Sequence, residues 1–93
     1  MKGSYLEEEI SHVLEEIKDE DLKDLVVFND DINTFEHVIS TLIKVCNHRP
    51  EQAEQCTWII HYKGKCCVRK GSITELKPMK EAILEHGINA AVV

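Results

Sequence analysis

Two polar segments of the chain, one around Asn29 and one around His61, carry side chains that could bind a small cationic group. Asn29-Asp30-Asp31 follows a short apolar run, and His61 lies near the end of a later helical pattern. Asn29 offers an amide oxygen, Asp31 a carboxylate and neutral His61 a ring nitrogen, all of which accept hydrogen bonds. A free α-amino group, whose pKa is about 7.7 to 8.0, is mostly a cation with three donors at neutral pH. These acceptors could surround such a group, with Asp30 behind them or on a water molecule.

Each hydrogen bond to a charged group contributes about 1.5–3 kcal/mol, so two or three of them would distinguish a free N-terminus from an internal peptide bond. The same residues also have local roles. Asn29 and Asp30 can end a strand, and Asp31 can cap a helix. His61 near the end of a helix interacts favourably with the helix dipole. Taken one at a time, the residues are explained by these local roles.

Catalysis is an alternative use of Asp30, Asp31 and His61, because carboxylates and histidine serve as general acids and bases. The chain offers no convincing nucleophile, phosphate-binding loop or zinc motif to accompany them. We therefore expect a protein that is not an enzyme.

The cysteines do not have the spacing of a metal site. No two of them form a C-x-x-C pair, and neither His48 nor His61 completes a zinc ligand set. In a reducing cytosol small core residues with free thiols are the expectation. The sequence predicts no metal and no cofactor. The four cysteines are Cys46, Cys56, Cys66 and Cys67.

Length and charge restrict the class of protein. A chain of 93 residues has room for one domain with a modest core. The net charge of −6 argues against nucleic acid as a partner, and the basic residues Lys63, Lys65, Arg69 and Lys70 are a local exception. No apolar run approaches the length of about 18 residues that a membrane span needs, and no signal-peptide pattern opens the sequence. A cytoplasmic, non-membrane protein is expected.

Hydrophobic periodicity predicts the elements that position these residues. We expect an acidic extension over residues 1–21, flexible or partly helical, and a core domain over residues 22–93. The core elements follow in the order strand, helix, helix, strand, helix, strand. Their expected positions are a strand at Leu25–Phe28, a helix capped by Asn33 or Thr34 and ended by Asn47-His48-Arg49, a helix from Pro50 to His61, a strand near Cys66–Val68, a helix from Ser72 to Gly87 and a strand within Ile88–Val93.

The third of these helices has a capping-box pattern in Ser72 and Glu75, but Pro78 lies inside it. An irregular first turn or a later start is therefore expected. The element order predicts an α+β fold, a small sandwich in which a three-stranded antiparallel sheet packs against three helices.

The chain resembles the ClpS adaptor family from about Leu25 onward. The resemblance is carried by the Asn29-Asp30-Asp31 loop after a strand, by the helix register of Glu36 and Val38, and by the segment from Ile60 to Lys65, which reads I-H-Y-K-G-K against the family's V-H-x-x-G-K. The joint pattern favours a binding site over the separate local roles. The resemblance implies a fold similar to the C-terminal domain of the ribosomal stalk protein.

The activity that the resemblance implies is recognition of N-degrons, proteins whose first residue is bulky and apolar, and their delivery to the ClpA unfoldase of the ClpAP protease. Asn29, Asp31 and His61, with Asp30, would bind the α-amino group. Glu75 and Lys80 approximately occupy the unfoldase-facing positions, and the acidic extension is expected to engage the unfoldase. The side-chain pocket would be lined by Val27, Phe28, Asn33, Phe35, Val38, Thr57 and Ile60.

Some positions differ from the family pattern. Asn33, Thr34 and Phe35 stand where the family commonly has Thr, Pro and a gating Met, and Thr57 replaces a residue that is usually Met. Phenylalanine is more rigid than methionine, so the preferred first residue is open. The alternative function is a diverged interaction module with this fold and a different partner or an altered N-terminal specificity.

Overall fold

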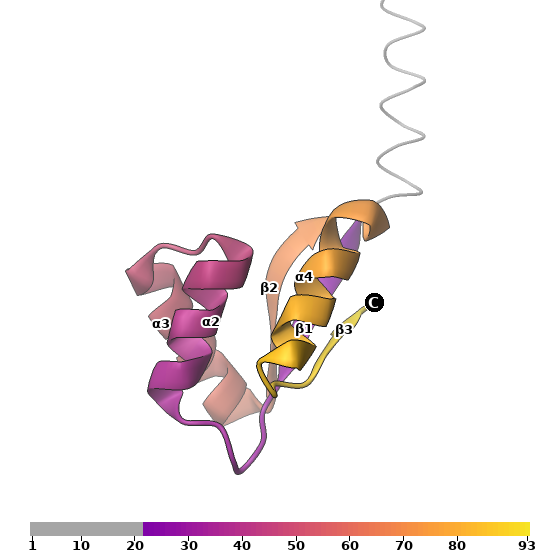
Figure 1. Ribbon diagram of the computed structural model, residues 1–93. Coiled ribbons are helices and arrows are strands. Elements are labelled where there is room, and N and C mark those ends of the chain that lie inside the picture. Colours follow the sequence, from indigo (N-terminus) through magenta and orange to yellow (C-terminus); the bar gives the residue numbers. More distant parts are fainter. Residues whose placement is uncertain (1–21) are drawn as a thin grey trace, which may run out of the picture.

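The structure is a computed structural model that describes residues 22–93. The expected acidic extension, residues 1–21, lies outside the described residues. Three helices and three strands follow one another in the expected order (Figure 1). They are β1 (Lys23–Phe28), α2 (Phe35–Cys46), α3 (Pro50–Lys63), β2 (Lys65–Gly71), α4 (Ile73–Glu85) and β3 (Ala90–Val92).

The sheet has the order β2-β1-β3, and both pairings are antiparallel. The predicted α+β fold is therefore confirmed. β1 is central because its apolar run can be buried on both faces: Leu25 and Val27 are almost fully buried and Val26 is 9% exposed. Val27 pairs with Cys66 on one side and with Ala90 on the other.

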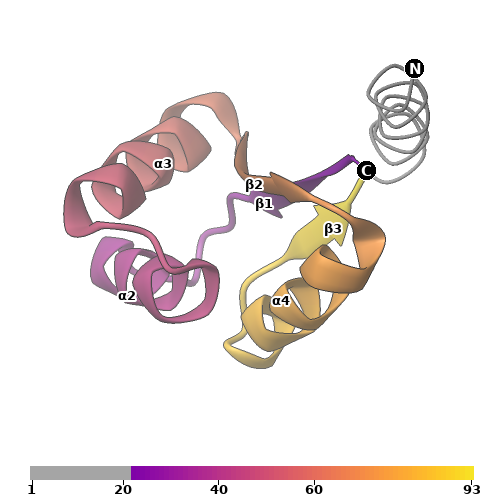
Figure 2. The same ribbon diagram turned by 90° about the horizontal axis from the view of Figure 1, so that it is seen from above.

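One face of the sheet carries the hydrophobic core. Figure 2 shows α4 lying along the sheet, with the α2–α3 pair beside it. Leu25 and Val27 contribute the sheet side of the core, since alternate residues of a strand point to the same face. All three helices meet them there. The helical members of the core are Val38, Leu42, Cys46, Ala53, Ile60, Leu76 and Ile83.

The helix ends follow local chemistry. Of the two expected caps of α2, Thr34 is the one used, and its hydroxyl accepts a hydrogen bond from the His37 amide at 3.1 Å. Asn47 ends α2 in the left-handed conformation with φ of 57°, and Gly64 ends α3 with φ of 92°. Both residue types tolerate this conformation, which a branched side chain would resist.

The expectation of a late start for α4 is wrong. The helix begins at Ile73, directly after its cap Ser72, and continues through Pro78. Proline there removes one intrahelical donor but does not end the helix, because Leu76 and Ile83 on either side of it are fully buried in the core.

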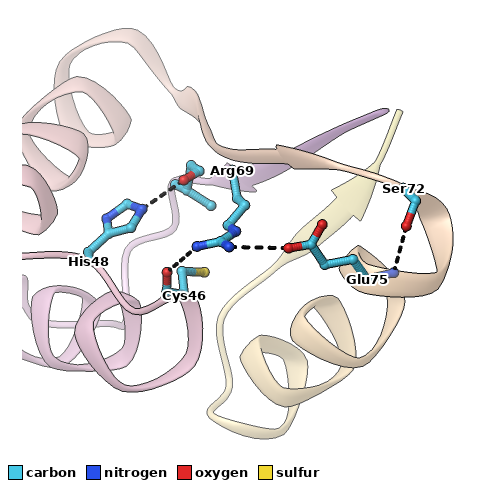
Figure 3. Close-up of polar contacts among 6 residues, drawn as sticks. Cys46, His48, Arg69, Ser72 and Glu75 are labelled. Atoms are coloured by element: carbon cyan, nitrogen blue, oxygen red, sulfur yellow. Dashed lines mark hydrogen bonds and ion pairs between the residues drawn. The ribbon is translucent and has the colours of Figure 1, made fainter. Parts of the chain in front are cut away.

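The capping box at the start of α4 is half formed. The Ser72 hydroxyl accepts from the Glu75 amide at 3.2 Å, as the pattern predicts. The Glu75 carboxylate instead pairs with Arg69 of β2 at 3.1 Å (Figure 3). Arg69 also donates to the carbonyl of Cys46 at 3.0 Å, so one guanidinium joins β2 to the end of α2 and to the first turn of α4.

His48, in the segment that follows α2, forms a second hydrogen bond with β2. Its ring is buried, and Nε2 lies 2.7 Å from the carbonyl of Val68 (Figure 3). A carbonyl only accepts, so Nε2 carries the hydrogen. His48, one of the residues that break the helix pattern in the sequence, thus also anchors the α2–α3 turn to β2.

Candidate functional site

A pocket of about 330 Å³ opens where the end of β1, the start of α2 and the end of α3 meet. Its size is at the lower end for ligand sites, which suits a single side chain with its backbone rather than a large ligand. Polar residues of the 29–34 loop line one part of it and apolar helix residues line another. The lining residues are Asn29, Asp30, Asp31, Asn33, Thr34, Phe35, Val38, Thr57, Ile60 and His61.

A backbone contact brings the polar loop that begins at Asn29 close to the end of α3, where His61 lies. The amide of Asn29 donates to the carbonyl of Gly64 at 2.9 Å, and the amide of Gly64 donates to the carbonyl of Ile60 at 2.9 Å. The end of β1 is thereby tied to the turn that ends α3. Asn29 and His61 consequently line the same pocket although they are far apart in the sequence.

Asp30 holds the shape of the loop. Its Oδ1 accepts from the amides of Ile32 and Asn33 at 2.8 and 2.7 Å, and its Oδ2 accepts from Asn33 Nδ2 at 2.6 Å. The amide of Asn33, followed by the other hydrogen bonds, holds the pKa of Asp30 below its usual value of 3.8, while partial burial opposes the shift. Asp30 therefore organises the loop with the same oxygens that a ligand would need.

Asp31 is the exposed carboxylate of the loop. Within residues 22–93 it makes no hydrogen bond or ion pair through its side chain, and Thr34 rather than Asp31 caps α2. Asp31 therefore does not have the helix-capping role that the sequence allowed for it. Its oxygens remain available to a ligand at the pocket.

Asn33 connects the loop to the other side of the molecule. Its Nδ2 group donates both to Asp30 and, at 2.9 Å, to the carbonyl of Gly87, in the turn between α4 and β3. Both amide hydrogens are engaged, so the Asn33 side chain presents only its oxygen to the pocket.

The apolar part of the pocket is made by helix residues. Val38 and Ile60 are buried core residues, and Phe35 is half-buried at the start of α2. Thr57 is buried and its hydroxyl donates to the carbonyl of Ala53 at 2.7 Å, which satisfies its hydrogen within the helix. A buried polar side chain is thus accommodated beside the apolar wall.

Two of the residues expected in the side-chain pocket, Val27 and Phe28, do not line it. The alternation of β1 explains both. Val27 points into the core beneath the helices, with 1% of its surface exposed. Phe28 is half-buried on the face that Val26 also occupies. Thr34 lines the pocket although the sequence indicated it only as a cap; its position between two lining residues was the available signal.

An aromatic cluster borders the pocket, and it was not predicted from the sequence. Phe35 and His61 line the pocket, while Trp58 and Tyr62 extend from them along the exposed side of α3. The Phe35 and Trp58 rings meet edge to face with centroids 4.5 Å apart, and Trp58 and Tyr62 are stacked at 5.2 Å. The i, i+4 spacing of Trp58 and Tyr62 was the signal that could have indicated this contact.

The residues expected to face the unfoldase lie on α4 and do not line the pocket. Glu75 is paired with Arg69, and Lys80 is half-buried in the middle of the helix. Among residues 22–93, no group of three or more His, Cys, Asp or Glu side chains is placed to hold a metal ion. None of the helices in this part of the chain combines the length and apolarity needed to cross a membrane.

The pocket can therefore bind a molecule that presents a cation beside an apolar group. Acceptors from Asn29, Asp31 and His61 lie at one part of the surface, and the apolar wall of Val38 and Ile60 lies at another. A cation bound there would gain charge-assisted hydrogen bonds, and an apolar group would gain burial.

Comparisons with known proteins agree with one another. The family model described as ATP-dependent Clp protease adaptor protein ClpS matches residues 18–91. An ATP-dependent Clp protease adapter protein ClpS from Thermosynechococcus vestitus is 34% identical over 68 residues, which is 72% of this chain and 72% of that protein. Among solved structures, Agrobacterium tumefaciens ClpS2 bound to L-phenylalaninamide matches with a TM-score of 0.67 and 19% identity, over 78% of this chain and 95% of that one.

Proposed function

The chain belongs to the ClpS family of ATP-dependent Clp protease adaptors, and from this premise we propose that it captures N-degrons and delivers them to a ClpA-type unfoldase of the ClpAP protease. The family acts as adaptors rather than as proteases, and we propose that this chain likewise performs no catalysis. Its place of action would be the cytoplasm.

The observation that carries the proposal is the meeting of Asn29, Asp31 and His61 in one pocket with an apolar wall. A substrate's α-amino group would donate to the Asn29 oxygen, the Asp31 carboxylate and a neutral His61 nitrogen. An internal peptide nitrogen has one hydrogen and no charge, so it cannot satisfy the three acceptors. This difference would make the site selective for a free N-terminus.

The first side chain would enter the apolar part of the pocket, between Phe35, Val38 and Ile60. L-phenylalaninamide, the ligand of the A. tumefaciens relative, combines a free α-amino group with a bulky apolar side chain. A ligand of this class suits the polar and apolar parts of the present pocket, which supports the proposal. Asp30 would act indirectly, by holding the loop that presents Asp31.

Delivery would use a different surface. We assign the unfoldase contact to Glu75 and Lys80 of α4 and to the acidic residues 1–21. Glu75 is exposed, and its pairing with Arg69 leaves part of its carboxylate at the surface. Because α4 does not line the pocket, the chain could hold a substrate and an unfoldase at the same time.

Binding is tested by fluorescence anisotropy with labelled peptides that begin with Leu or Phe, each compared with its N-acetylated form. Two or three charge-assisted hydrogen bonds predict that acetylation weakens binding by about 100-fold or more. Micromolar or tighter binding of the free peptide supports the proposal. Equal binding of both forms would contradict amine capture and favour the alternative, a diverged interaction module with another partner.

Delivery is tested separately, by degradation of a reporter with an N-terminal Leu by ClpAP in the presence and absence of the chain. Acceleration that a competing free-amine dipeptide abolishes is expected. A truncated chain that begins at Asp21 should bind the reporter but fail to accelerate its degradation. Equal acceleration by the full and truncated chains would remove the role of the acidic extension and leave substrate capture intact.

A further inference from the structure

Trp58 lies next to the pocket, in contact with residues that line it. It does not line the pocket, but its ring packs against Phe35, which does. The two centroids are 4.5 Å apart and the planes are inclined by 65°, an edge-to-face arrangement. Aromatic rings attract each other in this geometry because the positive edge of one ring meets the negative face of the other. Phe35 is therefore packed against a ring that does not itself line the cavity.

Trp58 is itself held in place. The ring of Tyr62, one helical turn further along α3, is stacked on it at 5.2 Å with the planes within 10° of parallel. The His61 ring lies 6.4 Å from Trp58 and 5.9 Å from Phe35, in edge-to-face arrangements with both. A series of ring contacts thus runs from Tyr62 on the surface of α3, through Trp58, to Phe35 in the wall of the pocket.

From this arrangement we infer that Trp58 is a specificity-determining residue, which positions Phe35 without touching the substrate. The inference rests on the proposed capture of N-degrons. Phenylalanine has two side-chain torsions, and rotation of the ring is the simplest way to widen the pocket. An outward rotation of Phe35 would break the edge-to-face contact with Trp58, so this contact favours one shape of the pocket.

A pocket of fixed shape discriminates among side chains more strongly than one whose wall can adjust. A difference of one methylene in a rigid apolar pocket changes binding by about 10-fold or more. A wall that moves recovers part of this loss by repacking. The Phe35–Trp58 contact therefore favours a narrow choice of first residue, taken from the class of bulky apolar side chains, rather than equal acceptance of Leu, Phe and Trp.

The experiment measures dissociation constants for three peptides that differ only in a first residue of Leu, Phe or Trp. The proteins are the wild type, Trp58→Ala and Trp58→Phe. Ile59→Ala is the matched control, because Ile59 is 41% exposed on the same helix and Trp58 is 44% exposed. The wild type should separate its best and worst peptides by about 10-fold or more. Trp58→Ala should narrow this range to roughly threefold, Trp58→Phe should retain most of it, and Ile59→Ala should leave it unchanged.

An unchanged range in Trp58→Ala, or a wild type that already binds all three peptides equally, would overturn the inference while the capture of N-termini stands. Failure of the wild type to bind any free-amine peptide would overturn the proposed function, and this inference with it. A uniform loss of affinity in Trp58→Ala, with the ratios preserved, would show a merely structural role.

A second measurement needs no variant at Trp58. Trp58 is the sole tryptophan of the chain, so fluorescence excited at a wavelength that tyrosine does not absorb reports on its ring alone. Phe35→Leu should shift the emission of the free protein to the red, because loss of the edge-to-face contact exposes the indole. An unchanged emission spectrum would mean that Phe35 and Trp58 do not hold each other in solution, which would overturn the inference.

Discussion

The amide of Asn29 donates a hydrogen bond to the carbonyl of Gly64 across 2.9 Å. This contact joins the residue after the central strand to the residue after α3. Asn29 and His61 line the same pocket because of it, since His61 belongs to the last turn of α3. The position of the site therefore depends on a turn that only a residue with access to positive φ forms without strain.

Gly64→Ala should lower the free energy of unfolding by about 1–2 kcal/mol. Gly64 has φ of 92°, and an added Cβ would meet no atom within 4 Å, so the cost comes from the backbone alone. Urea denaturation measures the change, and Gly64→Asn is the control because asparagine tolerates this conformation better. An alanine variant as stable as the asparagine variant would contradict this explanation.

Asp31→Ala should weaken binding of free-amine peptides by roughly 10- to 100-fold, the loss of one charge-assisted hydrogen bond. The melting temperature should hardly change, because Asp31 is exposed and its side chain has no partner within residues 22–93. Asp31→Asn keeps a hydrogen-bond acceptor, so its affinity for these peptides should lie between those of the wild type and Asp31→Ala. Glu81→Ala, which removes an exposed carboxylate from α4, is the control for net charge. Equal affinity for Asp31→Ala and Glu81→Ala would remove Asp31 from the site.

Arg69→Ala should destabilise the fold by about 1–2 kcal/mol, because the guanidinium joins three elements through Cys46 and Glu75. Lys70→Ala is the matched control. Lys70 pairs with Asp24 at 2.8 Å, but the pair is exposed, and such pairs contribute little. Chemical denaturation should rank the Arg69 variant as clearly less stable than the Lys70 variant. The reverse order would show that the junction in Figure 3 does not stabilise the domain.

The Cys46 thiol should make the protein less stable in alkali. Burial raises its pKa from 9.0 to about 11, and the nearby Arg69 guanidinium opposes the shift. Between these two values the unfolded chain loses the proton while the folded chain keeps it. The stabilising contribution is therefore complete below pH 9.0 and disappears as the pH rises to about 11. Urea denaturation from pH 8 to pH 11 measures the slope.

Cys46→Ala separates this contribution from those of Cys66 and Cys67, the pKa values of which are also raised, chiefly by burial. The variant should be less stable at pH 8, because it loses packing in the core, but its stability should fall less steeply above pH 9. Parallel pH profiles of the wild type and the variant would contradict the assignment to Cys46.

Much of the fold could be predicted from the sequence because the signals are local. Pro50 at the first position of α3, Ser72 before α4 and the positive-φ residue Gly64 each act on the backbone within a few residues. The apolar run Leu25–Phe28 and the helical spacing of the core residues indicate which segments are strands and helices. The polar residues of the candidate site could be identified for the same reason, since their types determine what they can accept.

Only the tertiary structure decided which of these residues face one another. Val27 points into the core and does not line the pocket. Asp30 accepts hydrogen bonds within its own loop, while Asp31 is exposed. The tertiary structure also placed Trp58 against Phe35. Such pairings arise when distant segments pack together to bury the core, and the free energy of that packing depends on the whole set of contacts. A residue's type and its sequence neighbours do not contain this information.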